Sequence, residues 1–128
     1  MDISLDSLFE HSFVISVSDE RLSAFKRRFL EEGLPIPRVF TGFQYRNGVY
    51  RSAGIVKTRD TSNVRLSNLA IAKAAEALDW PFVCIFEDDA RPGGGAGQKL
   101  QSALQELPED IDMLKLGWLC KRDVVAFS

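Results

Sequence analysis

The chain has very little histidine and cysteine. Its 128 residues include one histidine, His11, and two cysteines, Cys84 and Cys120. A single histidine argues against a histidine-rich zinc site and against a serine–histidine catalytic triad. Two cysteines in apolar surroundings do not form a disulfide framework, so we expect a reducing, cytoplasmic location.

A net positive charge, targeting features and long apolar runs are also lacking. The net charge is −2, so no basic field suggests a nucleic-acid partner. The N-terminal stretch MDISLDSLFEHS lacks the basic region of a signal peptide. No apolar stretch approaches the roughly 18 residues of a transmembrane segment, so none is expected. A hydrophobic content of 45% suffices for the core of a single domain, residues 1–128.

Short apolar segments alternate with segments of helical periodicity along the chain. Strands are predicted at residues 13–17, 37–43, 81–87, 111–119 and 124–127. Helices are predicted after Ser18 as N-cap up to Gly33, after Thr61 or Ser62, and around residues 100–107. Residues 44–62 are predicted to be irregular, with a hairpin possible through Asn47 and Gly48. The alternation predicts an α/β fold with an open sheet flanked by helices.

Helical spacing also predicts which side chains are buried. In the first helix the apolar positions are Leu22, Phe25, Phe29 and Leu30. In the second they are Leu66, Leu69, Ala70, Lys73, Ala74, Ala77 and Leu78. Residues 81–87 form the most apolar run, which is typical of a strand covered on both faces.

Three adjacent carboxylates, Glu87, Asp88 and Asp89, end that apolar run. Ligands of open α/β sheets bind beyond the carboxyl ends of the strands, and carboxylate oxygens suit a hard divalent cation. In an extended backbone Glu87 and Asp89 would point to one side and Asp88 to the other. The alternative is a solvated strand end beside a turn.

Two loops carry weaker signals. Residues 44–65 hold five basic residues and one acid, which suits an anionic ligand and, nearly as well, a mobile solvated loop. The stretch PGGGAGQK lacks the G-K-[ST] ending of a phosphate-binding loop, so we interpret it as a flexible turn.

Four stretches, in order, resemble glycosyltransferase family 25, which includes lipooligosaccharide and collagen galactosyltransferases. They are VISV followed by Arg21, SNLAIAK from Ser67 to Lys73, PFVCIFEDD up to Asp89, and LPEDIDMLKLG from Leu107 to Gly117. The resemblance implies a GT-A-like, Rossmann-like open mixed sheet, shorter than is usual for the family. It also implies a UDP-sugar donor and a divalent metal, Mn²⁺ or Mg²⁺.

The resemblance assigns roles to individual residues. Nucleotide-sugar binding would fall to Ser16, Arg21, Ser67, Asn68, Lys73 and Asp88, and metal binding to Glu87 and Asp89. Asn68 stands where the family has histidine, so it can form a hydrogen bond with the sugar donor but cannot shuttle a proton. Family members run well beyond the last stretch, so the general base is expected in a segment without a counterpart here.

Structural roles for the same residues stay open. Ser67 could cap or pack near a helix start, Arg21 could lie on a solvated helix face, and Lys73 could extend its charge to solvent from an apolar stripe.

Three functional hypotheses follow. The first is a glycosyltransferase that moves a sugar such as galactose from a UDP-sugar to a glycan or lipopolysaccharide acceptor. The second is a non-catalytic relative that binds a nucleotide, a glycan or a protein. The third is an unrelated α/β module, such as a receiver-like domain, that uses acidic residues for magnesium. An exposed edge strand would favour a homodimer.

Overall fold

The computed structural model describes residues 3–46, 49–52, 55–57, 63–116 and 126–127, and the side chains of residues 3–43, 66–113 and 116. The elements in chain order are α1 (Leu5–Glu10), β1 (Ser12–Ser16), α2 (Asp19–Glu31), β2 (Arg38–Thr41), β3 (Gln44–Arg46), β4 (Val49–Ser52), β5 (Ile55–Lys57), α3 (Asn63–Ala77), β6 (Cys84–Glu87), α4 (Ala96–Gln105), β7 (Leu114–Lys115) and β8 (Ala126–Phe127). None of the helices in these segments is both long and apolar enough to cross a membrane.

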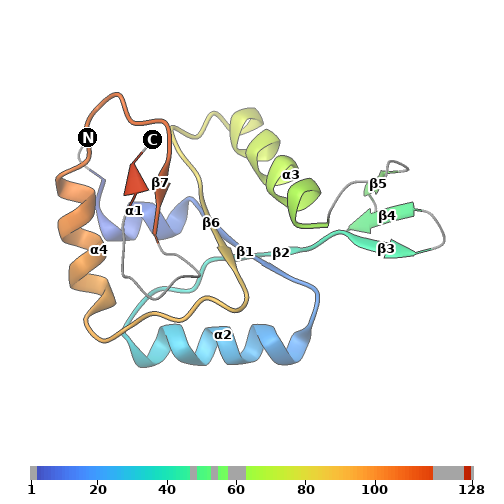
Figure 1. Cartoon of the computed structure of the whole chain (residues 1–128), viewed down its shortest axis with the longest axis horizontal. Coiled ribbons are helices and arrows are strands. Elements are labelled where there is room, and N and C mark those ends of the chain that lie inside the picture. The colour runs from blue at the N-terminus through green and yellow to red at the C-terminus, as the bar shows by residue number, and fades with distance from the viewer. Residues whose placement is uncertain (1–2, 47–48, 53–54, 58–62, 117–125, 128) are drawn as a thin grey trace.

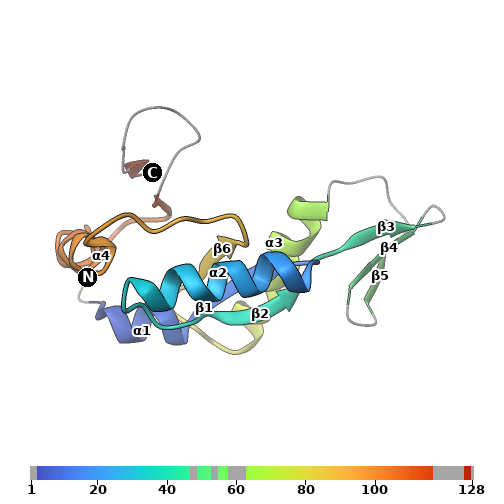
Figure 2. The ribbon, with the colours of Figure 1, turned by 90° about the horizontal axis from the view of Figure 1, so that it is seen from below.

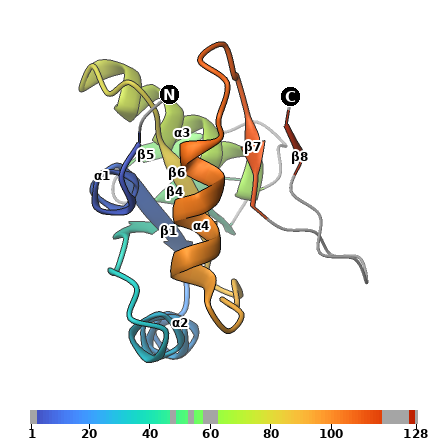
Figure 3. The same ribbon diagram turned by 90° about the vertical axis from the view of Figure 1, so that its left-hand side faces the viewer.

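A small parallel sheet lies at the centre of the fold. Its three strands have the order β2-β1-β6, and β1 is parallel to both neighbours. Helices α2 and α3 lie on opposite faces of this sheet (Figures 1 and 3). The open α/β sheet flanked by helices is therefore confirmed. The prediction of a mixed sheet is wrong for the described residues, because their antiparallel pairs belong to separate small sheets, β3-β4-β5 and β7-β8.

Helix α2 begins and ends where the sequence predicts. The N–H of Arg21 donates to Ser18 Oγ at 3.2 Å, so Ser18 satisfies one of the unpaired donors of the first turn. After the last turn Gly33 has a φ of 68°, which glycine adopts without steric cost.

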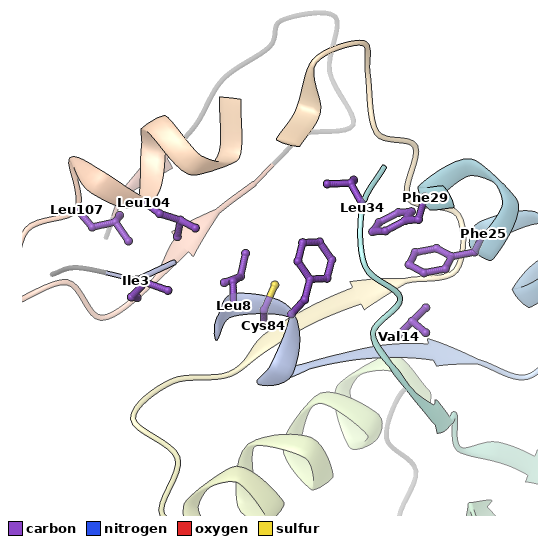
Figure 4. Close-up of a cluster of buried hydrophobic side chains, with 10 residues drawn as sticks. Ile3, Leu8, Val14, Phe25, Phe29, Leu34, Cys84, Leu104 and Leu107 are labelled. Carbon is purple, nitrogen blue, oxygen red and sulfur yellow. The ribbon is translucent and has the colours of Figure 1, made fainter. Parts of the chain in front are cut away.

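The main hydrophobic core lies between α2 and the sheet (Figure 4). Val14 of β1 points to this face, where Phe25 and Phe29 of α2 stack with ring centroids 4.1 Å apart. Phe86 of β6 packs edge-on to Phe29 at 5.3 Å. The buried members of the cluster are Ile3, Leu8, Phe9, Val14, Phe25, Phe29, Leu34, Cys84, Leu104 and Leu107. Helices α1 and α4 therefore extend the core that α2 begins.

On the other face, α3 buries a different stripe from the one predicted. Ser67, Ile71 and Ala75 are buried, whereas Leu69 and Leu78 are 51% and 58% exposed. Both sets recur at helical spacing, so periodicity alone could not choose between them. The buried set places the hydroxyl of Ser67 beside the backbone N–H of Phe43, which donates to it at 3.0 Å. That polar contact is invisible in a pattern of apolar residues.

Several peripheral elements differ from expectation. The hairpin is confirmed, since Arg46 pairs with Val49, but β5 lies in a stretch predicted to be irregular. Figures 1 and 2 show β3, β4 and β5 projecting beyond the end of β2. Helix α1 was not predicted, although Ser4 caps it. The last two predicted strands appear only as β7 and β8, and residues 117–125 lie outside the described chain.

Removing one core ring tests the packing. We expect Phe29→Ala to lower the free energy of unfolding by about 3–5 kcal/mol, because it leaves a cavity among the aromatic rings. The neighbouring Leu30→Ala should change it by less than about 0.5 kcal/mol, since Leu30 is 65% exposed. Urea unfolding measures both, and similar losses in the two variants would contradict this core.

The buried thiol of Cys84 makes stability depend on alkaline pH. Burial raises the pKa of Cys84 from 9.0 to about 12. Between these values the folded chain keeps a proton that the unfolded chain has lost, so the free energy of unfolding falls as pH rises above about 9. From pH 8 to pH 10 we expect the wild type to lose about 1 kcal/mol more than Cys84→Ala. If the free energy of unfolding, measured with urea, falls equally with pH in the wild type and in Cys84→Ala, this effect of the Cys84 thiol is ruled out.

Candidate functional site

The three parallel strands end at one edge of the sheet. Ser16 ends β1 and pairs with Thr41, which ends β2, while Ile15 pairs with Glu87, which ends β6. Just past the strands, the N–H of Gly42 donates to the carbonyl of Ser16 at 3.1 Å. The residues that follow these strands therefore lie close together, and the acidic triplet is among them.

Asp88 is the buried member of the triplet, with 7% of its surface exposed. One carboxylate oxygen accepts a hydrogen bond of 2.8 Å from Ser16 Oγ, and the other lies 2.7 Å from the guanidinium of Arg21. Strand β6 stops at Glu87, and a turn follows in which the N–H of Ala90 donates to the carbonyl of Glu87 at 3.0 Å. A buried carboxylate needs such partners, because desolvation of an unpaired charge is costly.

The alternation of side chains along the strands explains why Asp88 faces α2. Cys84 and Phe86 point into the core beneath α2, and Asp88 continues the same two-residue period. In β1, Val14 and then Ser16 follow the same rule, so the hydroxyl and the carboxylate meet on that face. The neighbours Glu87 and Asp89 are exposed.

A second arginine of α2 holds the backbone of the turn. Arg28 donates from Nε to the carbonyl of Ala90 at 3.1 Å and from Nη2 to the carbonyl of Asp88 at 2.9 Å. The planar guanidinium can bridge two acceptors in this way, which an ammonium group cannot do with the same geometry. Helix α2 thus binds both the side chain of Asp88, through Arg21, and the turn that carries it.

A hollow of about 330 Å³ lies between α2 and this turn. Its lining is Glu20, Arg21, Ala24, Arg28, Asp88, Asp89 and Arg91. Asp88 and Asp89 line the same hollow and Glu87 does not, so the expected pairing of Glu87 with Asp89 on one side is wrong, because the extended strand ends at Glu87. The charged groups are three arginines and three carboxylates, so the wall as a whole is neutral. Such a wall suits a ligand that carries charges of both signs, as a complex of a divalent cation with a phosphate anion does.

The structure brings together half of the residues assigned to nucleotide-sugar binding. Ser16, Arg21 and Asp88 form one connected group. Ser67 and Asn68 belong to α3, which covers the opposite face of the sheet (Figure 3). The hydroxyl of Ser67 is buried against the backbone of Phe43. The lining of the hollow includes neither Ser67 nor Asn68. It does not include Lys73 either, which is exposed and about 9 Å farther along the helix than Ser67.

The metal assignment stays a prediction. Glu87 and Asp89 are exposed, and both oxygens of Asp88 already have partners. Within the described segments, no three histidine, cysteine or acidic side chains are grouped as a metal site would require. The exposed carboxylates have the oxygen chemistry that Mn²⁺ or Mg²⁺ prefers.

Arg28 and Arg91 are two charged residues of the lining that reasoning from the sequence missed. Arg28 had a usable signal, because it lies seven positions after Arg21 and two helical turns place both on one face. Arg91 had none beyond its place near the triplet.

Comparisons with protein-family models, with curated proteins and with solved structures gave no match. The geometry of the site therefore carries the functional argument.

Matched substitutions in the triplet test the burial of Asp88. We expect Asp88→Asn to lower the free energy of unfolding by about 1–2 kcal/mol, because it removes the charge that Arg21 and Ser16 bind. Asp89→Asn should change it by less than about 0.5 kcal/mol, since that side chain is exposed. Chemical denaturation of both variants at pH 7 gives the comparison. Equal effects would mean that Asp88 is not the buried carboxylate.

Proposed function

We propose that the carboxyl edge of the central sheet binds a nucleotide diphosphate sugar together with Mn²⁺ or Mg²⁺. The corresponding activity is that of a cytoplasmic glycosyltransferase similar to family 25. It would transfer a sugar such as galactose from a UDP-sugar to a glycan or lipopolysaccharide acceptor. The observation that carries the proposal is the convergence of Ser16, Arg21 and Asp88 beside a charged hollow at that edge.

The charges of the hollow suggest how the donor would be held. Arg21 and Arg91 supply positive charge for the diphosphate. The side chain of Arg21 is 57% exposed, so its remaining N–H groups can donate to the diphosphate while Nη2 stays paired with Asp88. Asp89, which lines the hollow, supplies a carboxylate for the cation, and Glu87, which is exposed at the end of β6 but is not part of the lining, is proposed as a second one. When bound, the cation would offset the repulsion between carboxylates and diphosphate and stabilise the diphosphate as a leaving group.

A second candidate function is donor binding without transfer. It is favoured by Asn68, which stands where the resembled family has histidine, and by the lining of the hollow, which includes neither Ser67 nor Lys73. Catalysis by the first candidate requires a base that deprotonates the acceptor hydroxyl. Hydrolysis of the UDP-sugar separates the two, because a binding domain leaves the donor intact.

Calorimetric titration tests donor binding. We expect UDP and UDP-galactose to bind in the presence of Mn²⁺ and to bind at least about tenfold more weakly without it. Glu87→Ala and Asp89→Ala should lose a similar factor. Glu76→Ala, an exposed acidic residue of α3, serves as the control and should keep the wild-type affinity. If the wild type binds no nucleotide with or without Mn²⁺, both transfer from a UDP-sugar and binding of that donor are ruled out.

A further inference from the structure

The segment that follows the turn after β6 gives the turn little support. Beyond it come Pro92, which has no N–H to donate, and three glycines before α4 begins at Ala96. Side chains added at Gly93 or Gly94 would meet none of the described atoms within 4 Å, so this stretch runs through open space. Glycine also loses more backbone entropy on ordering than any other residue. The turn itself is held by the packing of Ala90 against the core and by its bond to the carbonyl of Glu87, and the segment that follows adds no support.

Helix α2 adds hydrogen bonds to the backbone of the turn. Arg28 is half-buried in the hollow and bonds the carbonyls of Asp88 and Ala90, which flank Asp89. These bonds join positions 60 and 62 residues apart in the sequence. They fix the backbone on both sides of Asp89, while the bonds from Ser16 and Arg21 fix only the carboxylate of Asp88.

We infer that Arg28 is a positioning residue, which holds the turn so that the exposed carboxylate of Asp89 faces the ligand in the hollow. The inference rests on the proposed function for the identity of that ligand, a complex of a divalent cation with a nucleotide diphosphate. Arg28 acts through the turn backbone. Its bonds to two neutral carbonyl oxygens leave the charge in place, and Arg28→Lys, which keeps a charge but not the bridge, separates the two contributions.

Hydrogen exchange without any ligand tests whether the two hydrogen bonds from Arg28 hold the turn, a contact called the Arg28 clamp below. In Arg28→Met we expect the amide of Ala90, which bonds the carbonyl of Glu87, to exchange about tenfold faster than in the wild type. Arg27→Met, an exposed neighbour on the same helix, is the matched control and should leave that rate unchanged. Circular dichroism verifies that both variants are folded. An unchanged rate at Ala90 in folded Arg28→Met overturns the inference.

Binding of UDP with Mn²⁺ tests the positioning role. We expect Arg28→Met to weaken binding about tenfold, and Arg28→Lys to behave like Arg28→Met, because an ammonium keeps the charge but not the two-carbonyl bridge. Recovery of wild-type affinity in Arg28→Lys would overturn the inference in favour of a simple charge effect. In an Asp89→Ala background, Arg28→Met should add little further loss, and fully additive losses would also contradict it.

The two proposals fail differently. If the wild type binds no nucleotide but exchange at Ala90 accelerates in Arg28→Met, the clamp stands and the proposed function is wrong. If nucleotide binds but Arg28→Met has wild-type exchange and affinity, the proposed function stands and the inference about Arg28 is wrong.

Discussion

The parallel register between β1 and β6 places Ser12 opposite Cys84 and Val14 opposite Phe86. This alignment sends both strands' alternate side chains to the same face, beneath α2. Most of that face is apolar core, where Phe86 and Val14 meet the rings of α2. One step beyond the end of the register, Ser16 and Asp88 occupy the same face at the edge of the sheet. The pairing of β1 with β6 therefore determines that the apolar core is followed by the charged site on the same face.

Helix α2 contributes both to the hydrophobic core and to the charged site. Its apolar side packs Phe25 and Phe29 against the sheet, and its neighbouring side carries Arg21 and Arg28. A carboxylate as buried as Asp88 would be strongly destabilising without a cation and a hydrogen-bond donor. Any shift of α2 along the sheet would thus disturb the core and the site together.

Local signals predicted much of the fold. The order of strands and helices was predictable because its signals are local. Short apolar runs indicate strands, and Ser18 and Gly33 mark the start and the end of α2. The buried face of α3 was not, because Ser67 is buried by a hydrogen bond to a segment 24 residues away. Likewise, the triplet marked a place at the end of β6, but the sequence could not show which carboxylate is buried. That choice depends on where β6 ends and on the distant partners Ser16 and Arg21.

Paramagnetic relaxation by Mn²⁺ would locate the cation directly. In a ¹⁵N-labelled sample with UDP, the proposed site predicts that substoichiometric Mn²⁺ first broadens the amide signals of residues 87–91 and of Arg21. The amides of α4 near Leu104, within the apolar core, should stay sharp at the same Mn²⁺ level. Broadening centred elsewhere, or no selective broadening with UDP present, would contradict a metal and diphosphate site at this edge of the sheet.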